Sequence, residues 1–291
     1  MRYRRTAAGT ARSLPAWCVK RGQSCILCAM KVLVIGGSGY MGKALVNQLL
    51  DAGDTVLILN RGRTPDDFGD KVQRLKADRS DRTQFRAALE EAGSVDACID
   101  FSAYEASHVS DVVLVLAGKV GHYVFISTNS VYMSDIPDNS ELYSDEEFPS
   151  GSQWNAPVDT PQQQKYGWDK RSCEEVLVAA HAAGGFPATR LRIPAICGPG
   201  DTSYRWFRLH KWLQSGKPVY ATNPIGGYCA CFSLDVVSAV RATIAAGSVA
   251  FGQVYHITQT PASTLPEVID AMSSGSKTYE HTHTHTHTHT H

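Results

Sequence analysis

Long uninterrupted apolar runs are scarce in this sequence of 291 residues. The longest that we identify lie around residues 32–35 and 112–116, far short of the roughly 18 to 20 apolar residues that a membrane-spanning helix needs. With 43% hydrophobic and 19% charged residues, the chain has the composition of a soluble globular protein with a sizeable core. We therefore expect no membrane-spanning segment.

Acidic side chains are absent from the first 30 residues, which carry six basic ones: Arg2, Arg4, Arg5, Arg12, Lys20 and Arg21. The rest of the chain has 22 basic and 28 acidic side chains, hence a net charge of minus six. Nucleic-acid binding depends on cations that neutralise phosphates, so we expect no nucleic-acid partner.

The basic N-terminal segment also gives an indication of the subcellular location. An Arg-rich, hydroxyl-containing and acid-free N-terminus is typical of a mitochondrial presequence. Alternatively, because Met30 directly precedes the first strand-like run, residues 1–29 are an upstream extension that contributes nothing to the fold. We expect a cytoplasmic protein, with a mitochondrial location as the alternative.

Matched sets of metal ligands are also missing, although the chain has eight cysteines. Cys25 and Cys28 have ligand-like spacing, but no second pair accompanies them, and Cys229 and Cys231 are too close together. We predict no metal site and expect structural or incidental thiols.

Apolar residues are absent from the C-terminal tract, where His and Thr alternate from His281 to His291. Such a low-complexity tract cannot build a core, and a translated CA repeat would produce it. We expect the folded part to end near Met272 and residues 273–291 to form a low-complexity tail.

Between residues 31 and 193, short β-branched runs alternate with longer helical ones, a pattern typical of parallel strands joined by crossover helices. The predicted helices start near Tyr40, Arg82, Ala106 and Gln163. The predicted strands are residues 31–35, 55–60, 72–77, 97–101, 122–127 and 189–193. We therefore predict an α/β fold with a Rossmann-type, doubly wound parallel sheet, whose ligands bind beyond the carboxyl ends of the strands.

After Ile193 the alternation loosens. We predict a helix over residues 204–214, a strand near Val219 and a helix over residues 234–246. Together with the Pro- and Gly-rich residues 135–160, these elements indicate a smaller part built over the strand ends.

A glycine-rich loop joins the first predicted strand to the first helix, in the sequence KVLVIGGSGYMGKALVNQLL. Gly36 permits a tight turn, Gly39 lets the backbone approach a pyrophosphate, and Gly42 allows the helix to pack closely on the strand. The N–H groups at the positive end of the helix would then meet the pyrophosphate. The loop predicts a dinucleotide site; its other members are Ser38, Tyr40 and Met41. The alternative is a glycine-rich turn without a ligand.

No carboxylate follows the second predicted strand, where an acidic side chain would receive the ribose 2′-hydroxyl of NAD. The chain has Asn60-Arg61-Gly62-Arg63 there, and arginine accepts the 2′-phosphate of NADP. We predict NADP as the cofactor, bound by Arg61, with NAD as the second choice. A solvated loop is the alternative interpretation of Arg61 and Arg63.

Tyr166 and Lys170 are four residues apart and hence lie on one face of a predicted helix. The pair follows a hydroxyl-rich strand end that contains Thr128. A nearby cation favours the ionised form of tyrosine, so Lys170 is expected to lower the pKa of Tyr166 towards neutrality. Thr128 could hold the substrate oxygen. The alternative is an amphipathic helix with Tyr166 half-buried.

These features resemble the extended or atypical short-chain dehydrogenase/reductases, the NAD-dependent epimerase/dehydratase family. The resemblance covers residues 31–272 and depends on GGSGYMG, FISTNSVY, YGWDK and RLRIPAICGPGD. It implies that Thr128, Tyr166 and Lys170 are catalytic, and that Asp78 contacts the adenine amino group. Residues 253–257 resemble a late strand of the substrate part.

Three departures from the family pattern concern the pocket. Residues 101–104, Phe-Ser-Ala-Tyr, replace a His-x-Ala-Ala type segment, so Ala103 falls where the resemblance implies a cofactor contact. Met133 replaces a customary glycine, and Cys197 a common tyrosine. The family also normally continues for tens of residues beyond Met272, so the small C-terminal substrate region is expected to be truncated.

The expected organisation is thus a basic extension (1–29), a dinucleotide-binding domain (30–193), a substrate-binding region (194–272) and the tail. We hypothesise hydride transfer on a carbonyl or alcohol of a small molecule, with a nucleotide sugar as one candidate. The alternative is a non-catalytic dinucleotide-binding protein, sensory or RNA-associated. In relatives the helices after the fourth and fifth strands commonly pair, which implies a homodimer. The loops that would choose the substrate carry no recognisable chemistry.

Overall fold

The computed structural model describes residues 29–132, 161–219, 227–259 and 261–274. Its centre is a seven-stranded sheet in the order β10-β6-β5-β4-β1-β2-β3, in which every neighbouring pair is parallel. The strands are β1 (Lys31–Ile35), β2 (Thr55–Asn60), β3 (Val72–Lys76), β4 (Ala97–Asp100), β5 (Tyr123–Thr128), β6 (Ala188–Ile193) and β10 (Val254–His256). The doubly wound prediction is confirmed, and the six predicted strands agree with the structure to within one residue.

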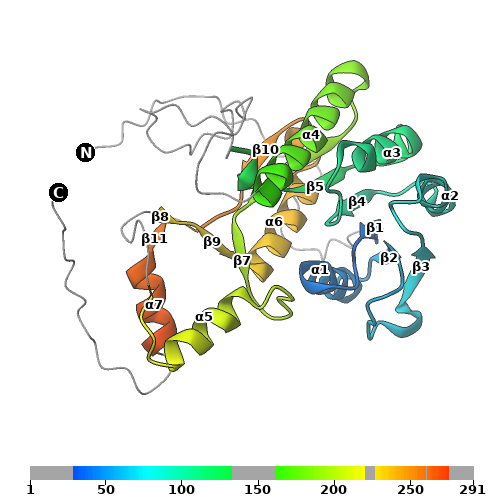
Figure 1. The fold of residues 1–291 in the computed structure, drawn as a ribbon. Helices are drawn as coiled ribbons and strands as arrows, with labels where there is room; N and C mark the ends of the chain where they lie inside the picture. Colours follow the sequence, from blue (N-terminus) through cyan, green and yellow to red (C-terminus); the bar gives the residue numbers. More distant parts are fainter. Residues whose placement is uncertain (1–28, 133–160, 220–226, 260, 275–291) are drawn as a thin grey trace, which may run out of the picture.

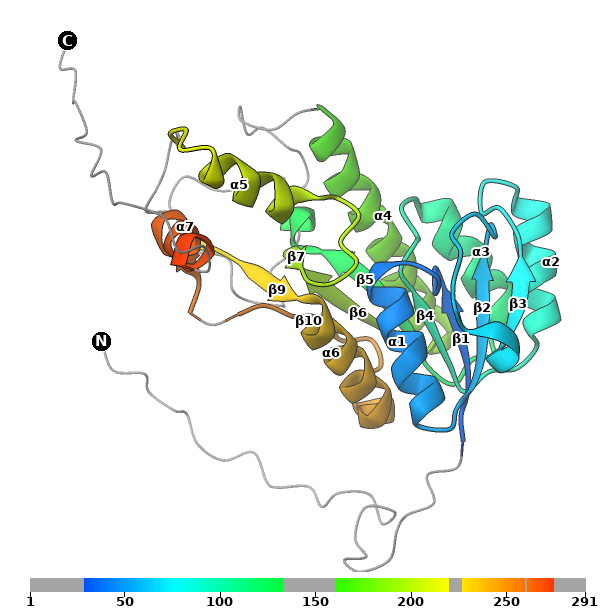
Figure 2. The ribbon, with the colours of Figure 1, turned by 90° about the horizontal axis from the view of Figure 1, so that it is seen from below.

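Helices cover both faces of this sheet (Figures 1 and 2). One face carries α1 (Tyr40–Asp51) and α6 (Ser233–Ala246), and the other α2 (Arg82–Ala92), α3 (Ala106–Leu116) and α4 (Pro161–Gly184). In β1, Val32 and Val34 pack towards α1 and α6, whereas Leu33 and Ile35 pack towards the opposite layer. Successive strand side chains point to opposite faces, so a strand buried on both faces must be apolar throughout.

β10 corrects the interpretation of residues 253–257 as a strand of the substrate part. It pairs in parallel with β6 and extends the main sheet, with Tyr255 opposite Leu191. The chain beyond Ile193 therefore sends one strand back into the sheet. The signal was a short β-branched run, which predicts a strand but not its partner.

A smaller group of elements lies beyond the carboxyl ends of the strands (Figure 1). It contains the parallel pair β7 (Ala195–Cys197) and β9 (Ala230–Phe232), and the antiparallel pair β8 (Gly227–Tyr228) and β11 (Ser263–Thr264). Two helices, α5 (Arg205–Gln214) and α7 (Leu265–Ser274), pack against each other. Single 3-10 turns occur at η2 (Gly69–Lys71), η3 (Asn129–Tyr132) and η4 (Gly247–Ala250).

The strand predicted near Val219 is wrong at that residue, which lies in irregular chain after α5. Gly216 adopts a φ of +69° at the end of the helix, and Pro218 has no N–H to donate to a sheet. The Pro218 carbonyl instead accepts a hydrogen bond of 3.1 Å from the Trp212 indole.

The expectation that apolar runs fall short of membrane length also needs a correction. The window Ser233–Ala250 has 18 residues with a mean hydropathy of 1.3, which is long and apolar enough by length and composition alone. In the fold, Val236, Val237 and Val240 of this helix are fully buried in the core layer shared with α1. The buried share of this window is 33%, and these residues pack in the core against the sheet.

Several predictions concern residues outside the described ones: the basic extension up to residue 28, the Cys25–Cys28 spacing, Met133, the Pro- and Gly-rich segment 135–160, and the His/Thr tail.

Candidate active site

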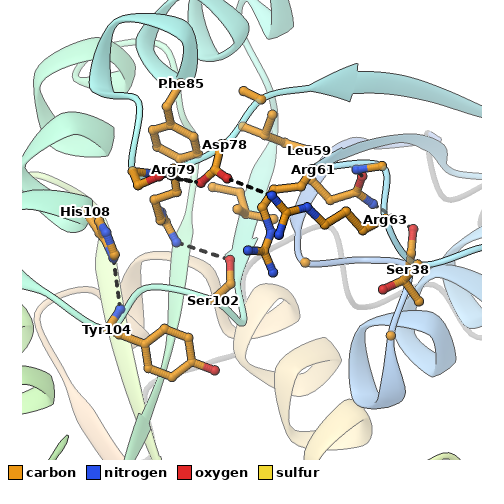
Figure 3. A pocket seen from close by; sticks show the side chains of 18 of the residues that line it. Ser38, Leu59, Arg61, Arg63, Asp78, Arg79, Phe85, Ser102, Tyr104 and His108 are labelled. Atoms are coloured by element: carbon orange, nitrogen blue, oxygen red, sulfur yellow. Dashed lines mark hydrogen bonds and ion pairs between the residues drawn. The ribbon is translucent and has the colours of Figure 1, made fainter.

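A cavity of about 760 Å³ lies over the carboxyl ends of β1 to β4. Its volume is in the range of small-molecule and cofactor sites. Figure 3 shows Ser38 at one side, the arginines around Asp78 in the centre, and Tyr104 and His108 at the other side. The cavity thus occupies the edge at which ligands bind in open α/β sheets.

The three glycines of the 36–42 loop have the geometry that a pyrophosphate site needs. Gly36 adopts a φ of +89° and donates its N–H to the Leu59 carbonyl at 3.1 Å. A Cβ on Gly39 would meet no atom within 4 Å, so this position is open to an approaching ligand. A Cβ on Gly42 would lie 2.2 Å from the Gly36 carbonyl oxygen, so only glycine lets the helix pack this closely.

Ser38 lines the cavity, and its side chain also holds the loop in place. Its hydroxyl donates to Asp66 at 2.9 Å and accepts from the Asn60 amide at 2.7 Å. Burial would raise the pKa of Asp66, but hydrogen bonds from Arg74 and Ser38 outweigh it and hold that pKa below its usual range. Asp66 therefore anchors the phosphate loop to the segment after β2, a contact that no local sequence pattern indicates.

Tyr40 and Met41 do not line this cavity. The first hydrogen bond within α1 runs from the Lys43 N–H to the Gly39 carbonyl, so the N–H groups of residues 40–42 precede it and are free of helical partners. Their expected contribution is from the backbone. The Tyr40 phenol is buried on another side near Asp201, and burial, followed by that carboxylate, raises its pKa.

Arg61 and Arg63 line the cavity beside Asp78 (Figure 3). Arg63 lies 3.8 Å from one oxygen of Asp78, and the other accepts from the Ser80 N–H and hydroxyl. The Ser80 hydrogen bonds are the main cause of a lowered Asp78 pKa, with the two arginines contributing less. The structure thus brings the predicted residues Arg61 and Asp78 together with Gly36 and Gly39 around one cavity.

Below the cavity, Asp100 at the end of β4 is fully buried and paired with Arg79. The Arg79 guanidinium donates to the two carboxylate oxygens at 2.8 and 2.5 Å, and the Tyr123 hydroxyl donates at 2.9 Å. Burial would raise the Asp100 pKa, but Arg79 outweighs it and the pKa is lowered. Sequence reasoning missed this pair, because the two residues are far apart in the sequence and meet only in the folded structure.

The prediction of Ala103 as a cofactor contact is not supported by its position. Its side chain is fully buried and does not line the cavity, whereas its neighbours Ser102 and Tyr104 do. The N–H groups of Ser102 and Ala103 donate to Asp100 at 2.9 and 3.0 Å. Asp100 therefore turns the segment so that alternate residues face the cavity.

Thr128, Tyr166 and Lys170 come together where β5 ends and α4 begins. The Thr128 hydroxyl donates to Ser130 Oγ at 3.2 Å and lies near enough to the Tyr166 phenol to favour its ionised form. Lys170 is only 3% exposed, and its ammonium donates to the Ile126 carbonyl at 2.7 Å. Its nitrogen also lies 4.9 and 4.7 Å from the ring centres of Tyr104 and Phe125.

Two contacts fix α4, one against η3 directly after β5 and the other against β5 and β6, and so place this group. A Cβ on Gly167 would lie 2.5 Å from the Ser130 carbonyl oxygen, so glycine permits the close approach. Farther along α4, buried Glu174 accepts from the Ser127 hydroxyl and pairs with Arg192 of β6. The helix is therefore held at both strands.

The predicted lowering of the Tyr166 pKa is wrong: this pKa is raised, and Lys170 is not among its main influences. Burial raises the pKa of Tyr166, and the Thr128 hydrogen bond, not Lys170, is the main influence that lowers it. The Lys170 ammonium is directed to the Ile126 carbonyl and the two rings, and burial lowers its own pKa to about 8. Spacing along a helix placed the two side chains together but did not determine where the ammonium points.

A second cavity of about 440 Å³ lies in the smaller part of the molecule. Its lining residues come from the turn after β7 and the start of α5: Gly198, Gly200, Asp201, Thr202, Tyr204, Trp206 and Phe207. Among the residues that the structure describes, no group of three or more His, Cys, Asp or Glu could hold a metal ion.

A model of the NAD dependent epimerase/dehydratase family matches residues 32–257. A 2-alkyl-3-oxoalkanoate reductase from Stenotrophomonas maltophilia is 30% identical over 186 residues, which cover 59% of this chain and 52% of the relative. The chloroplast stem-loop binding protein of 41 kDa b from Arabidopsis thaliana is 30% identical over 125 residues, covering 38% and 32%. The chain thus spans about half, or less, of the length of these relatives.

Solved structures show the same fold. A dTDP-glucose 4,6-dehydratase from Bacillus anthracis, in complex with NAD, has a TM-score of 0.66 at 18% identity and covers 84% of this chain and 81% of its own. A UDP-glucuronic acid 4-epimerase from Bacillus cereus, also with NAD, has a TM-score of 0.64 at 18% identity, covering 86% and 85%. Because the family model matches residues 32–257, this chain belongs to the NAD-dependent epimerase/dehydratase family.

Proposed function

We propose that this chain binds a nicotinamide dinucleotide and transfers hydride to or from a carbonyl or alcohol carbon of a small molecule. The observation that carries the proposal is one continuous arrangement: the glycine loop borders a cavity at one side, and Tyr104, at the other side, contacts the Tyr166–Lys170 pair. When bound, the nicotinamide supplies or accepts the hydride.

The residues of the chain fit this cofactor. Gly39 leaves open space at the start of α1, where the N–H groups of residues 40–42 precede the first helical hydrogen bond. A helix start of this kind attracts a diphosphate. Asp78 lies at the side of the cavity where the adenine would bind.

The proton is handled by hydroxyl groups. The substrate oxygen would bind to the Thr128 and Tyr166 hydroxyls, which lie near each other. Tyr166 would donate its proton to that oxygen in reduction and accept it in oxidation, at its Oη atom. Lys170 would keep a positive charge beside this site.

We propose NADP rather than NAD as the preferred cofactor. Arg61 and Arg63 border the cavity near Asp78, and both can reach an added phosphate. The side chain of Asn60, where a carboxylate would select NAD, is engaged by Ser38 and the Gly62 N–H. The two solved structures described above hold NAD, so the proposed preference would distinguish the present chain from them.

Thermal unfolding with each cofactor tests the proposal. A ligand that binds only the folded state stabilises it by about 2.7 kcal/mol at a concentration of 100 times its Kd. We expect NADPH to raise the melting temperature more than NADH at equal concentration. Replacing both Arg61 and Arg63 by alanine should remove the difference, while Lys119→Ala, an exposed site away from the cavity, should retain it. An equal or larger effect of NADH would contradict the NADP preference, and no effect of either would contradict cofactor binding.

The substrate is proposed only as a class. A 2-alkyl-3-oxoalkanoate and UDP-glucuronic acid are suitable probes because they correspond to the names of the relatives. Hydride transfer to or from either probe consumes or forms NADPH. The absorbance of the reduced nicotinamide therefore follows the reaction.

The similarity to a stem-loop binding protein supports a second candidate, a dinucleotide-binding protein that associates with RNA. The excess of acidic side chains after residue 30 opposes it. A salt-dependent affinity for a stem-loop RNA that persists after deletion of residues 1–29 would favour this second function.

We further propose a homodimer formed through α3 and α4. Large apolar side chains are exposed on these helices, namely Leu114, Trp168 and Val178. Exposed apolar side chains that gather on one surface are typical of association sites. For location, we propose the cytoplasm, with mitochondria as the alternative; a fluorescent fusion with and without residues 1–29 distinguishes the two.

A further inference from the structure

Tyr104 follows β4 at the point where this chain departs from the pattern of its family. Two anchors hold the segment: Asp100 accepts the N–H groups of Ser102 and Ala103, and the Tyr104 N–H donates to His108 Nδ1 at 3.2 Å. The Tyr104 side chain is half-exposed and lines the cofactor cavity (Figure 3). The backbone thus presents this ring at a defined place.

The ring of Tyr104 contacts both members of the proposed catalytic pair. Its centre lies 4.9 Å from Lys170 Nζ and 6.2 Å from the centre of the Tyr166 ring, with the two rings tilted by 47°. Phe125 approaches Lys170 Nζ to 4.7 Å, and the Ile126 carbonyl accepts its hydrogen bond. Lys170 is therefore held by two aromatic faces and one carbonyl.

This arrangement explains how an ammonium group can be buried here. An ammonium leaving water loses its hydration, and aromatic faces recover part of the loss. Of the two rings, Phe125 belongs to the core, whereas Tyr104 is half-exposed and therefore lies on the solvent side of Lys170. The other titratable groups that influence Lys170 are Cys173, Asp100, Arg79 and Glu174.

We propose that Tyr104 is a positioning residue whose ring covers Lys170, keeping its ammonium out of water and directed to the Ile126 carbonyl. The role of this contact in catalysis rests on the proposed function, but the contact between the Tyr104 ring and Lys170 is present without any substrate. The phenolic hydroxyl is dispensable for this role, because the aromatic face makes the contact. A planar ring at position 104 is therefore the requirement.

The titration of Lys170 tests this role without substrate or cofactor. Protein labelled with ¹³C-lysine is followed by NMR as the pH is raised, and the Lys170 signal is assigned by its loss in Lys170→Met. The full chain should show Lys170 titrating at about 8, which reflects its burial. Tyr104→Phe should preserve this midpoint, whereas Tyr104→Ala should raise it by at least one pH unit towards the ordinary lysine value, because water then reaches the ammonium.

An unchanged midpoint in Tyr104→Ala would overturn the proposal, and so would a Tyr104→Phe midpoint as high as that of the alanine variant. Tyr204→Ala, which removes an exposed aromatic side chain from the second cavity, is the matched control and should leave Lys170 unaffected. If the alanine variant does not fold, Tyr104→Ser replaces it with the same expected direction, because a small polar side chain also lets water reach the ammonium. Thermal stabilisation by NADPH, measured in parallel, separates failure of this inference from failure of the proposed function.

Discussion

At the scale of single residues, His122 shows how burial controls a titration. The Thr189 hydroxyl donates its proton to the Ala250 carbonyl at 2.6 Å, so its oxygen accepts from His122 Nε2 at 2.8 Å. The imidazole is therefore neutral with its proton on Nε2. Nδ1 is buried and has no hydrogen-bond partner among the described residues. A second proton would have no acceptor there.

We predict that His122 makes the protein less stable in mild acid. Burial lowers its pKa from 6.5 to about 4, so the unfolded chain takes up a proton first as the pH falls. Above pH 6.5 the His122 titration does not reduce the free energy of unfolding. Between pH 6.5 and about 4 it lowers that free energy progressively, by on the order of 3 kcal/mol in total. Urea unfolding at several pH values measures it. His122→Gln should flatten the decline by a similar amount, and an identical decline in the two proteins would contradict the prediction.

The second prediction at this scale concerns Tyr166. Tyr166→Phe removes the only atom proposed to carry the proton and leaves the ring in place. We expect turnover of an accepted carbonyl substrate to fall by at least 100-fold, within the usual range for general acid–base catalysis of roughly 10² to 10⁴. The Kd for NADPH, measured by fluorescence, should change less than threefold, by the order-of-magnitude argument that no cofactor contact is removed. Retained turnover would exclude Tyr166 as the acid–base group.

At the scale of elements, two glycines of the loop between β1 and α1 are expected to have different roles. We expect Gly39 to be needed for cofactor binding alone, and Gly42 for both stability and binding. Gly39→Ala adds a methyl group to open space, so the melting temperature should hardly change. The methyl group should nevertheless obstruct a diphosphate and weaken NADPH binding at least tenfold, about 1.4 kcal/mol. Gly42→Ala should reduce both stability and binding, because its Cβ would overlap the Gly36 carbonyl. Unchanged NADPH affinity in Gly39→Ala would contradict the assigned position of the pyrophosphate.

The Arg79–Asp100 pair joins the turn after β3 to the end of β4. Arg79→Met should destabilise the protein by roughly 3 to 5 kcal/mol, because it leaves a buried carboxylate without its cation. Lys119→Ala, which breaks an exposed pair with Glu90, should cost less than about 1 kcal/mol. Urea unfolding of the two variants at neutral pH provides the comparison. A loss for Arg79→Met as small as that for Lys119→Ala would show that Asp100 is not held as a buried anion.

At the scale of the whole molecule, the proposed dimer predicts one solution property. Leu114→Glu and Val178→Glu together place two charges on α3 and α4, at sites that are 64% and 49% exposed. Folding should be retained, because exposed positions tolerate charge. Sedimentation should shift from dimer to monomer, whereas Val249→Glu, at a 77% exposed site outside these helices, should remain dimeric. A monomeric wild-type protein would remove the proposal.

The sequence by itself determined the parallel α/β sheet, the phosphate loop and the placement of Tyr166 and Lys170 on one helix, because these features depend on local periodicity and on spacing along one chain. The tertiary structure decided what depends on distant segments. Asp66 reaches Ser38, Arg79 neutralises Asp100, β10 joins the main sheet, and the Lys170 ammonium turns towards Tyr104. Burial and long-range contacts set these directions and pKa values, and neither can be read from the order of the residues alone.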